Sequence, residues 1–164
     1  MKTVSWGILG ASKFALEQMG PAIHMAKGAE LAAVASRDVR KVSTFQGFAP
    51  TCRAISNYEE LIKDPEIDVI YIPLPHHLHK EWAIRAMNAG KHVLAEKPIA
   101  MHQCDFEDLL ETRNTTGLLV SEAFMIVHHP QWQRARQMVG DGAIGKVMHI
   151  TGGSAGPDCY RIDT

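Results

Sequence analysis

Short apolar runs alternate along the chain with segments in which apolar residues recur at helical spacing. The runs predict buried strands over residues 4–9, 31–35, 54–55, 69–72, 93–95 and 118–121. The segments between them predict helices over residues 13–19, 21–26, 39–48, 58–62, 79–89 and 103–115. Strands and helices that alternate in this way connect through right-handed crossovers and form a parallel sheet. The pattern therefore predicts an α/β fold, a Rossmann-type doubly wound parallel sheet.

Turn and capping residues mark the ends of several of these helices. Gly20-Pro21 should interrupt the first one, because proline suits the first turn of a new helix. Asp38 should cap the helix that follows the second strand. Either Ser56 or Asn57 should cap the helix after the third strand.

The pattern changes after residue 123. Residues 130–139 predict one more helix and residues 145–151 an isolated strand, followed by a loop rich in glycine. We expect residues 1–123 to form one domain and residues 124–164 to be the incomplete start of a second, α/β domain. A strand without a sheet exposes unpaired backbone groups, so association with another chain or fraying is expected there.

Composition narrows the classes of function. A formal net charge of -1 and the absence of long basic runs are atypical of a protein that binds nucleic acid. No apolar stretch approaches the roughly 20 residues of a membrane span, and residues 1–6 lead into the first strand without the long apolar core expected of a signal peptide. Cys52, Cys104 and Cys159 are far apart and form no Cys-x-x-Cys motif. We therefore expect a cytoplasmic protein with reduced thiols and no nucleic-acid or membrane partner.

A loosened form of the dinucleotide-binding fingerprint lies between the first strand and the first helix. Gly10 begins it, Ser12 stands where a second glycine is usual, and Ala15 takes the place of the third. The helix that follows presents free amides and partial positive charge to a phosphate. An ordinary strand–helix turn is the alternative, but a position on the first strand favours a dinucleotide. The predicted contacts come from Gly10, Ala11, Ser12, Lys13 and Phe14.

The end of the second strand indicates which dinucleotide binds. NAD enzymes usually carry an acidic residue here, which binds the ribose hydroxyls. This chain has Ser36 and Arg37 at that position, and Arg40 follows one turn later. A hydroxyl and a guanidinium match a 2′-phosphate, so NADP is preferred and NAD is the other possibility. Asp38 could serve the ribose, although helix capping is its simpler role.

The loop after the fourth strand should lie at the nicotinamide end of the cofactor. Prolines stiffen it, and a cluster of histidines follows. Those histidines have no acidic or cysteine partner at ligand spacing, so no metal site is predicted. The candidate cofactor contacts in this loop are Pro73, Leu74, Pro75, His76 and His79.

Glu96, Lys97 and Pro98 follow the fifth strand, at the edge where open α/β sheets hold ligands. Pro98 biases Lys97 toward an extended backbone. A lysine held stiffly at that edge is a candidate proton donor, and all three residues are candidate cofactor contacts. The alternative is a solvated surface pair that ends a strand.

Together these segments resemble the Gfo/Idh/MocA oxidoreductases, the family of glucose-fructose oxidoreductase and inositol dehydrogenase. The resemblance covers about residues 4–151. Its specific part is the run Gly-Lys-His-Val-Leu-Ala-Glu-Lys-Pro at residues 90–98. The other matching segments are residues 6–12, 33–38, 68–75, 122–125, 129–131 and 142–147. The pair Ser36-Arg37 resembles NADP-using members such as the dihydrodiol dehydrogenases.

The resemblance implies an enzyme in which residues 1–123 are the NAD(P)-binding Rossmann domain and residues 124–164 begin the substrate and dimerisation domain. Members transfer a hydride between nicotinamide and a carbon of a sugar, cyclitol or diol. Lys97 is then the catalytic lysine that assists proton transfer, and the full-length form is expected to be a homo-oligomer. The family's catalytic aspartate and histidine would lie beyond this chain. A non-catalytic dinucleotide-binding regulatory module or an inactive fragment is therefore the alternative.

Overall fold

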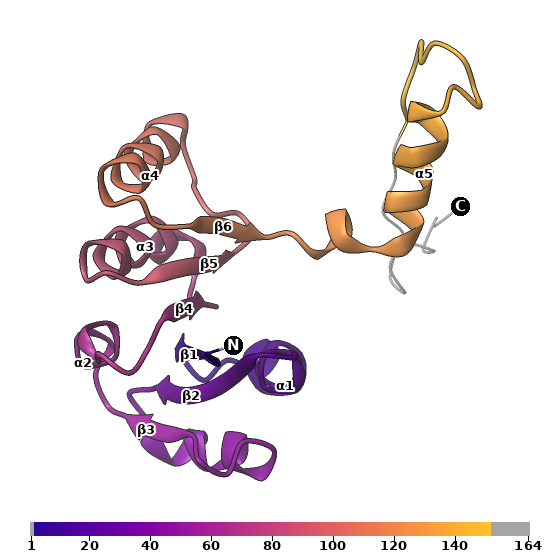
Figure 1. Cartoon of the computed structure of the whole chain (residues 1–164). Helices are drawn as coiled ribbons and strands as arrows, with labels where there is room; N and C mark the ends of the chain where they lie inside the picture. Colours follow the sequence, from indigo (N-terminus) through magenta and orange to yellow (C-terminus); the bar gives the residue numbers. More distant parts are fainter. Residues whose placement is uncertain (1, 152–164) are drawn as a thin grey trace, which may run out of the picture. The chain divides into compact units, whose positions relative to one another are not determined.

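The computed structural model describes residues 2–151, and its sheet confirms the predicted fold. Six parallel strands pair in the order β3-β2-β1-β4-β5-β6 (Figure 1). The strands are β1 (Val4–Leu9), β2 (Ala29–Ala35), β3 (Arg53–Ile55), β4 (Val69–Ile72), β5 (His92–Glu96) and β6 (Val120–Ala123). The chain builds outward from β1 to β3, then returns to β4 beside β1 and continues to β6. This order is that of a doubly wound sheet.

Helices cover both faces of the sheet (Figure 1). On one face lie α2 (Tyr58–Lys63), α3 (His79–Asn88) and α4 (Gln103–Thr116), and on the other lie η1 (Ala15–Met19), α1 (Gly20–Met25) and η2 (Val39–Gly47). In β1, Leu9 belongs to the buried cluster that includes Leu61 of α2, whereas Ile8 belongs to the cluster that includes Ile23 of α1. Where a strand is buried on both faces its residues are apolar, which explains the nearly continuous apolar runs in the sequence.

The first helical segment divides at Gly20 into a π-helix and an α-helix, so the predicted division is present as a change of helix type without a gap in the chain. The segment η1 is a π-helix, and the Gly20 amide donates to the carbonyl oxygen of Ala15. Pro21 then falls in the first turn of α1, where its missing N–H is not needed. A Cβ on Gly20 would lie 2.7 Å from the Ala15 oxygen, so the wide turn requires glycine there.

Capping contacts fix the helices on either side of β3. Asp38 accepts a hydrogen bond from the Arg40 amide at 3.2 Å and caps η2, a 3-10 helix, as predicted. Of the two candidate caps for α2, Asn57 is the one that accepts, from the Glu59 amide at 2.8 Å. Side-chain oxygens at these positions satisfy amides that the first helical turn leaves unpaired.

The last strand begins two residues later than predicted. Gly117 adopts a left-handed conformation that ends α4, and the residues after it form a short connection. In that connection the Leu119 carbonyl accepts from Val93, and the Leu119 amide donates to Nδ1 of His92. Pairing with β5 then starts at Val120.

The chain divides into two compact units, Met1–Phe124 and Met125–Thr164. The second unit contains η4 (Met125–His128) and α5 (Pro130–Gly140), which agrees with the predicted helix over residues 130–139. Residues 145–151 form no strand, so that prediction is wrong. A strand requires a paired neighbour, and this segment pairs with none of the described residues. The predicted loop after residue 151 and Cys159 lie outside the described residues.

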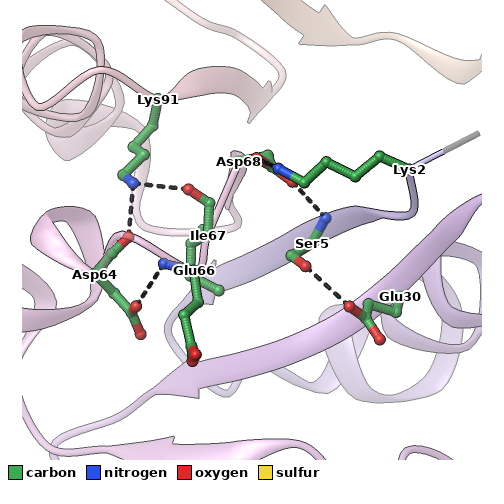
Figure 2. A network of polar contacts seen from close by, with 8 residues as sticks. All are labelled: Lys2, Ser5, Glu30, Asp64, Glu66, Ile67, Asp68 and Lys91. Atoms are coloured by element: carbon green, nitrogen blue, oxygen red, sulfur yellow. Dashed lines mark hydrogen bonds and ion pairs between the residues drawn. The ribbon is translucent and has the colours of Figure 1, made fainter.

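Hydrogen bonds and an ion pair of charged side chains link the segments at the amino ends of the strands (Figure 2). The amine of Lys91, which is 7% exposed, donates to the carbonyl oxygens of Asp64 at 2.6 Å and Ile67 at 2.7 Å. Burial lowers the pKa of Lys91. Nearby, the Asp68 carboxylate accepts from the Ser5 amide at 3.0 Å and forms an ion pair with Lys2. These contacts lower the pKa of Asp68.

Among residues 2–151, no helix has the length and apolar character needed to cross a membrane.

Candidate functional site

The predicted site residues gather at the carboxyl edge of the sheet, opposite the Lys91 network. A candidate site residue directly follows each of four neighbouring strands: Gly10 follows β1, Ser36 follows β2, Pro73 follows β4 and Lys97 follows β5. The strand order reverses between β1 and β4, because the chain runs outward in both directions from this pair. In open α/β sheets ligands bind at such a switch point, outside the carboxyl ends of the strands.

Gly10 forms the tight turn that leaves β1. Its φ is +98°, a left-handed conformation that favours glycine, and its amide donates to the Ala35 carbonyl at 2.8 Å. A Cβ on Gly10 would lie 3.0 Å from Cδ2 of Leu74 and 3.4 Å from the Tyr58 hydroxyl oxygen. The missing side chain therefore keeps the backbone accessible between the loops that follow β1 and β4.

The rest of the turn leads into the first helix. Ser12 Oγ accepts from the Ala15 amide at 3.1 Å, so this hydroxyl caps the helix and still has its own proton to donate. Ala11 is partly buried, whereas Lys13 and Phe14 are exposed. Lys13 forms a long ion pair with Glu17, at 3.8 Å.

The two candidate arginines after β2 differ in their surroundings. Arg40 forms a two-pronged contact with Asp38, Nε to Oδ1 at 2.9 Å and Nη2 to Oδ2 at 3.1 Å. This guanidinium lowers the pKa of the Asp38 carboxyl. Arg37 is exposed and forms no ion pair with the residues that the structure describes. Ser36 is 7% exposed, and its Oγ accepts from the Asp38 amide at 3.2 Å.

The loop after β4 has an exposed part and a buried part. Pro75 and His76 are exposed, and Pro73 and Leu74 are partly buried. His79, the first residue of α3 after the short helix η3 (His76–Leu78), has no exposed surface. Its ring is therefore placed within the protein, beneath the loop. The rings of His76 and His79 lie 5.6 Å apart between centroids.

Lys97, in the segment after β5, has an exposed side chain, and hydrogen bonds to nearby residues hold the backbone of this segment. Lys97 and Pro98 are exposed, the peptide bond between them is cis, and Glu96 is partly buried. The Glu96 carboxylate accepts from the Tyr71 hydroxyl at 2.7 Å. Burial, together with the Glu96 carboxylate, raises the pKa of Tyr71. The Ile99 amide donates to Oε1 of Glu122 at 2.9 Å.

Two of these supporting residues did not emerge from the sequence as site residues. Tyr71 lies inside an apolar strand, where its hydroxyl gives no separate signal. Glu122 lies in β6 within one of the segments that carry the family resemblance, and its acidic side chain in a short strand was the available signal. Among residues 2–151, no group of three or more His, Cys, Asp or Glu side chains could hold a metal ion.

A model of an oxidoreductase family with an NAD-binding Rossmann fold matches residues 4–124. The chain belongs to the Gfo/Idh/MocA oxidoreductase family. This membership confirms the resemblance inferred from the run at residues 90–98, and it agrees with the parallel sheet and the glycine turn after β1.

Members of the Gfo/Idh/MocA family with names and structures match most of this chain. An uncharacterized oxidoreductase of Rhizobium meliloti is 43% identical over 152 residues, which are 93% of this chain and 46% of the relative. A dTDP-3,4-didehydro-2,6-dideoxy-alpha-D-glucose 3-reductase of Streptomyces violaceoruber is 38% identical over 146 residues, 88% of this chain and 42% of the relative.

A solved structure shows the same fold. The 3-ketoreductase KijD10 from Actinomadura kijaniata, in complex with NADP, superposes with a TM-score of 0.81 at 34% identity. The match covers 88% of this chain and 46% of that protein. The chain thus spans about half the length of the relatives it matches.

Proposed function

We propose that this chain is the cofactor-binding part of an NADP-dependent oxidoreductase that transfers hydride between nicotinamide and a carbon of a sugar, cyclitol or diol. The observation that carries the proposal is the placement of Gly10 and Lys97. The first follows β1 and the second follows β5, at one edge of the sheet, with only β4 between their strands. A dinucleotide laid across the switch point would extend from the turn at Gly10 toward Lys97.

The residues at this edge fit a dinucleotide. The space beside Gly10, which a Cβ would fill, lets phosphate oxygens approach the backbone of the turn. The helix that begins after Ser12 would direct its first amides at the same phosphates. Ser36 and Arg37 would face the adenosine ribose, on the side of β2.

NADP is favoured over NAD because Arg37 is the guanidinium left available. Arg40 is already engaged by Asp38, and that contact occupies both carboxylate oxygens of the acidic residue that could otherwise bind the ribose hydroxyls. A guanidinium binds a phosphate through charge-assisted hydrogen bonds. The related 3-ketoreductase whose structure contains NADP supports this choice.

When bound, nicotinamide supplies or accepts the hydride. The chain contributes orientation and proton handling. The exposed amine of Lys97 would donate a proton to the substrate oxygen as a carbonyl is reduced, or hold the hydroxyl in the reverse direction. The related 3-reductase named for a keto-sugar supports a sugar-like substrate.

We further propose a cytoplasmic enzyme, homo-oligomeric in its full-length form, whose Rossmann domain ends near residue 123. The division of the chain after Phe124 supports this boundary. Cys52 and Cys104 are free, and burial raises the pKa of the Cys52 thiol to about 11. Such a thiol resists oxidation, as suits a reducing compartment.

Titration with NADPH and NADH, followed by cofactor fluorescence, tests the cofactor choice. Wild-type protein should bind NADPH more tightly than NADH. Arg37→Ala should weaken NADPH binding about 10- to 100-fold, the value of a lost charge-assisted contact of about 1.5–3 kcal/mol, and leave NADH binding unchanged.

Arg113→Ala is the matched control, since Arg113 is an exposed arginine on α4. It should bind both cofactors like the wild type. Equal or tighter binding of NADH by the wild-type protein would contradict the preference for NADP. Absence of binding to either cofactor would contradict the proposed function as a whole.

A further inference from the structure

The imidazole of His79 is a buried polar group that the proposed chemistry leaves without a role. Besides Tyr71 and Cys52, the described residues include three buried polar or charged ones: Ser36, His79 and Lys91. Ser36 lies at the ribose end of the candidate site, and Lys91 fastens the opposite edge of the sheet. His79 is 0% exposed, so its contacts inside the protein must compensate for the lost hydration of the ring.

The ring joins the two loops that follow β4 and β5. Its Nε2 lies 2.6 Å from the carbonyl oxygen of Leu74, and its Nδ1 lies 2.8 Å from the carbonyl oxygen of Pro98. Pro98 directly follows Lys97. The side chain of Leu74 borders the space beside Gly10, where a Cβ would come within 3.0 Å of it. One buried ring therefore connects the lysine segment to the loop that borders the phosphate turn.

Both partners of the His79 ring are acceptors, so only the ring can supply the donor in each contact. A carbonyl oxygen accepts, so each contact needs an N–H on the ring. A ring with one proton donates to one carbonyl, and donation to both requires a proton on each nitrogen. A glutamine side chain has its donors on a single nitrogen, and an aliphatic side chain has none.

Glu122 holds the same segment from β6. Its Oε1 accepts from the Ile99 amide at 2.9 Å. The backbone is thus held at two consecutive residues, by His79 at the Pro98 carbonyl and by Glu122 at the Ile99 amide. The Lys97 side chain stays exposed. A reacting group on a backbone held in this way is pre-organised for proton transfer.

We propose that His79 is a positioning residue that sets the separation between the loop after β4 and the Lys97 segment. It thereby shapes the nicotinamide end of the site. The inference rests on the proposed function, since it takes these two loops to border nicotinamide. The adenosine end is built on other strands, by the turn after β1 and by Ser36 and Arg37 after β2. Loss of the His79 ring should therefore weaken binding of the nicotinamide end of the cofactor and leave binding of the adenosine end unchanged.

Two probes separate the ends of the site. NADP+ carries nicotinamide, whereas adenosine 2′,5′-bisphosphate has the adenosine end with its 2′-phosphate and lacks nicotinamide. In calorimetric titrations His79→Leu should weaken NADP+ binding about tenfold, the loss expected for one or two buried hydrogen bonds. Its affinity for adenosine 2′,5′-bisphosphate should stay within about twofold of wild type. A merely structural histidine would affect both probes alike.

His77→Leu is the matched control, because His77 is an exposed histidine two residues away. It should bind both probes like the wild type. His79→Gln keeps a donor for one of the two carbonyls and should lose less NADP+ affinity than His79→Leu. Thermal melting identifies a variant that fails to fold. If His79→Leu does not fold, the affinities of His79→Gln for the two probes test the positioning role instead.

The possible results distinguish this inference from the proposed function. Equal weakening of both probes, or unchanged NADP+ affinity in a folded variant, would overturn the positioning role of His79. A wild-type protein that binds neither probe would overturn the proposed function. Selective loss of NADP+ affinity supports both.

Discussion

Lys97 combines an exposed side chain with a backbone that other elements hold in place. Tyr71 donates to the preceding residue, Glu96, and Glu122 accepts from Ile99, two residues later. The raised pKa of Tyr71 keeps its hydroxyl protonated, so that it remains a donor to Glu96. At the residue scale, the supports of the lysine are therefore hydrogen bonds to its neighbours in the chain, and its side chain stays exposed.

Lys97→Met tests the proton-transfer role directly. Methionine keeps much of the length of the side chain and removes the exchangeable proton. With NADPH and a panel of keto sugars and diol-derived ketones, kcat should fall about 10²- to 10⁴-fold, the usual contribution of a general acid. NADPH affinity, measured by fluorescence, should change much less than kcat because the phosphate turn is intact.

Lys63→Met, at an exposed lysine of α2, is the control and should retain the wild-type kcat. An unchanged kcat in Lys97→Met would remove the lysine from the mechanism. A wild-type protein that binds NADPH and a protein partner, and turns over no substrate, would favour a dinucleotide-binding regulatory module.

At the scale of elements, polar contacts at the ends of helices and strands decide which groups face the site. Asp38 caps η2 and holds Arg40, which leaves Arg37 as the available guanidinium. The wide turn of η1 carries the first helix through Pro21 and keeps it continuous with the turn at Ser12. At the opposite edge, Lys91 donates to the carbonyl oxygen of Asp64, which follows α2, and to that of Ile67, which lies shortly before β4.

Lys91→Met should show how much that connection contributes to stability. The substitution leaves the Asp64 and Ile67 carbonyl oxygens without their buried donor, which should reduce the free energy of unfolding by about 2–3 kcal/mol. Urea denaturation measures the loss. Lys63→Met, which removes an exposed lysine with a 3.9 Å ion pair, should change the same quantity by less than about 0.5 kcal/mol. Equal effects of the two substitutions would contradict a special role of Lys91.

At the scale of the whole molecule, the carboxyl edge of the sheet holds the candidate site residues, and the amino edge holds contacts that stabilise the fold. The carboxyl edge gathers the turn at Gly10, the loop after β4 and the Lys97 segment around the switch point. The amino edge carries the Lys91 and Asp68 contacts that join the starts of β1, β4 and β5 (Figure 2). Stabilising contacts are thereby kept apart from the loops that must accept a ligand.

The amino edge also predicts how stability depends on pH. The Ser5 amide and Lys2 hold the pKa of Asp68 below its usual value of 3.8. A carboxyl whose pKa is lower in the folded state stabilises the fold above the unfolded value and loses this contribution as pH falls through the folded value. The contribution of Asp68 to the melting temperature should therefore be constant between about pH 5 and pH 7, and the melting temperature should fall below about pH 4.

Asp68→Asn isolates this contribution. It should lower the free energy of unfolding by about 1 kcal/mol at neutral pH, because Asp68 is partly exposed and its charged contacts are partly screened. The difference from wild type should shrink as pH falls below about 4, where the wild-type carboxyl is also protonated. A difference that grows under acid conditions would contradict the assignment.

The sequence by itself determined the order and kind of most elements and the general location of the site. Apolar runs and capping residues such as Asp38 and Asn57 act over a few neighbouring positions, so a local pattern is enough to place them. The parallel alternation then requires that Gly10, Ser36 and Lys97 meet at one edge. The strand predicted over residues 145–151 was wrong because strand formation depends on a partner, which a local pattern does not supply.

Only the tertiary structure decided how the site residues are held. His79 and Pro98 are 19 residues apart, Ile99 and Glu122 are 23, and Tyr71 and Glu96 are 25. Each pair belongs to different elements, and nothing in the local sequence indicates which side chain reaches which backbone group. The burial of His79 follows from the same packing, because it depends on how the loops after β4 and β5 close over α3. Local sequence patterns thus placed Lys97 at the carboxyl edge of the sheet, and contacts between residues distant in the sequence determined its surroundings.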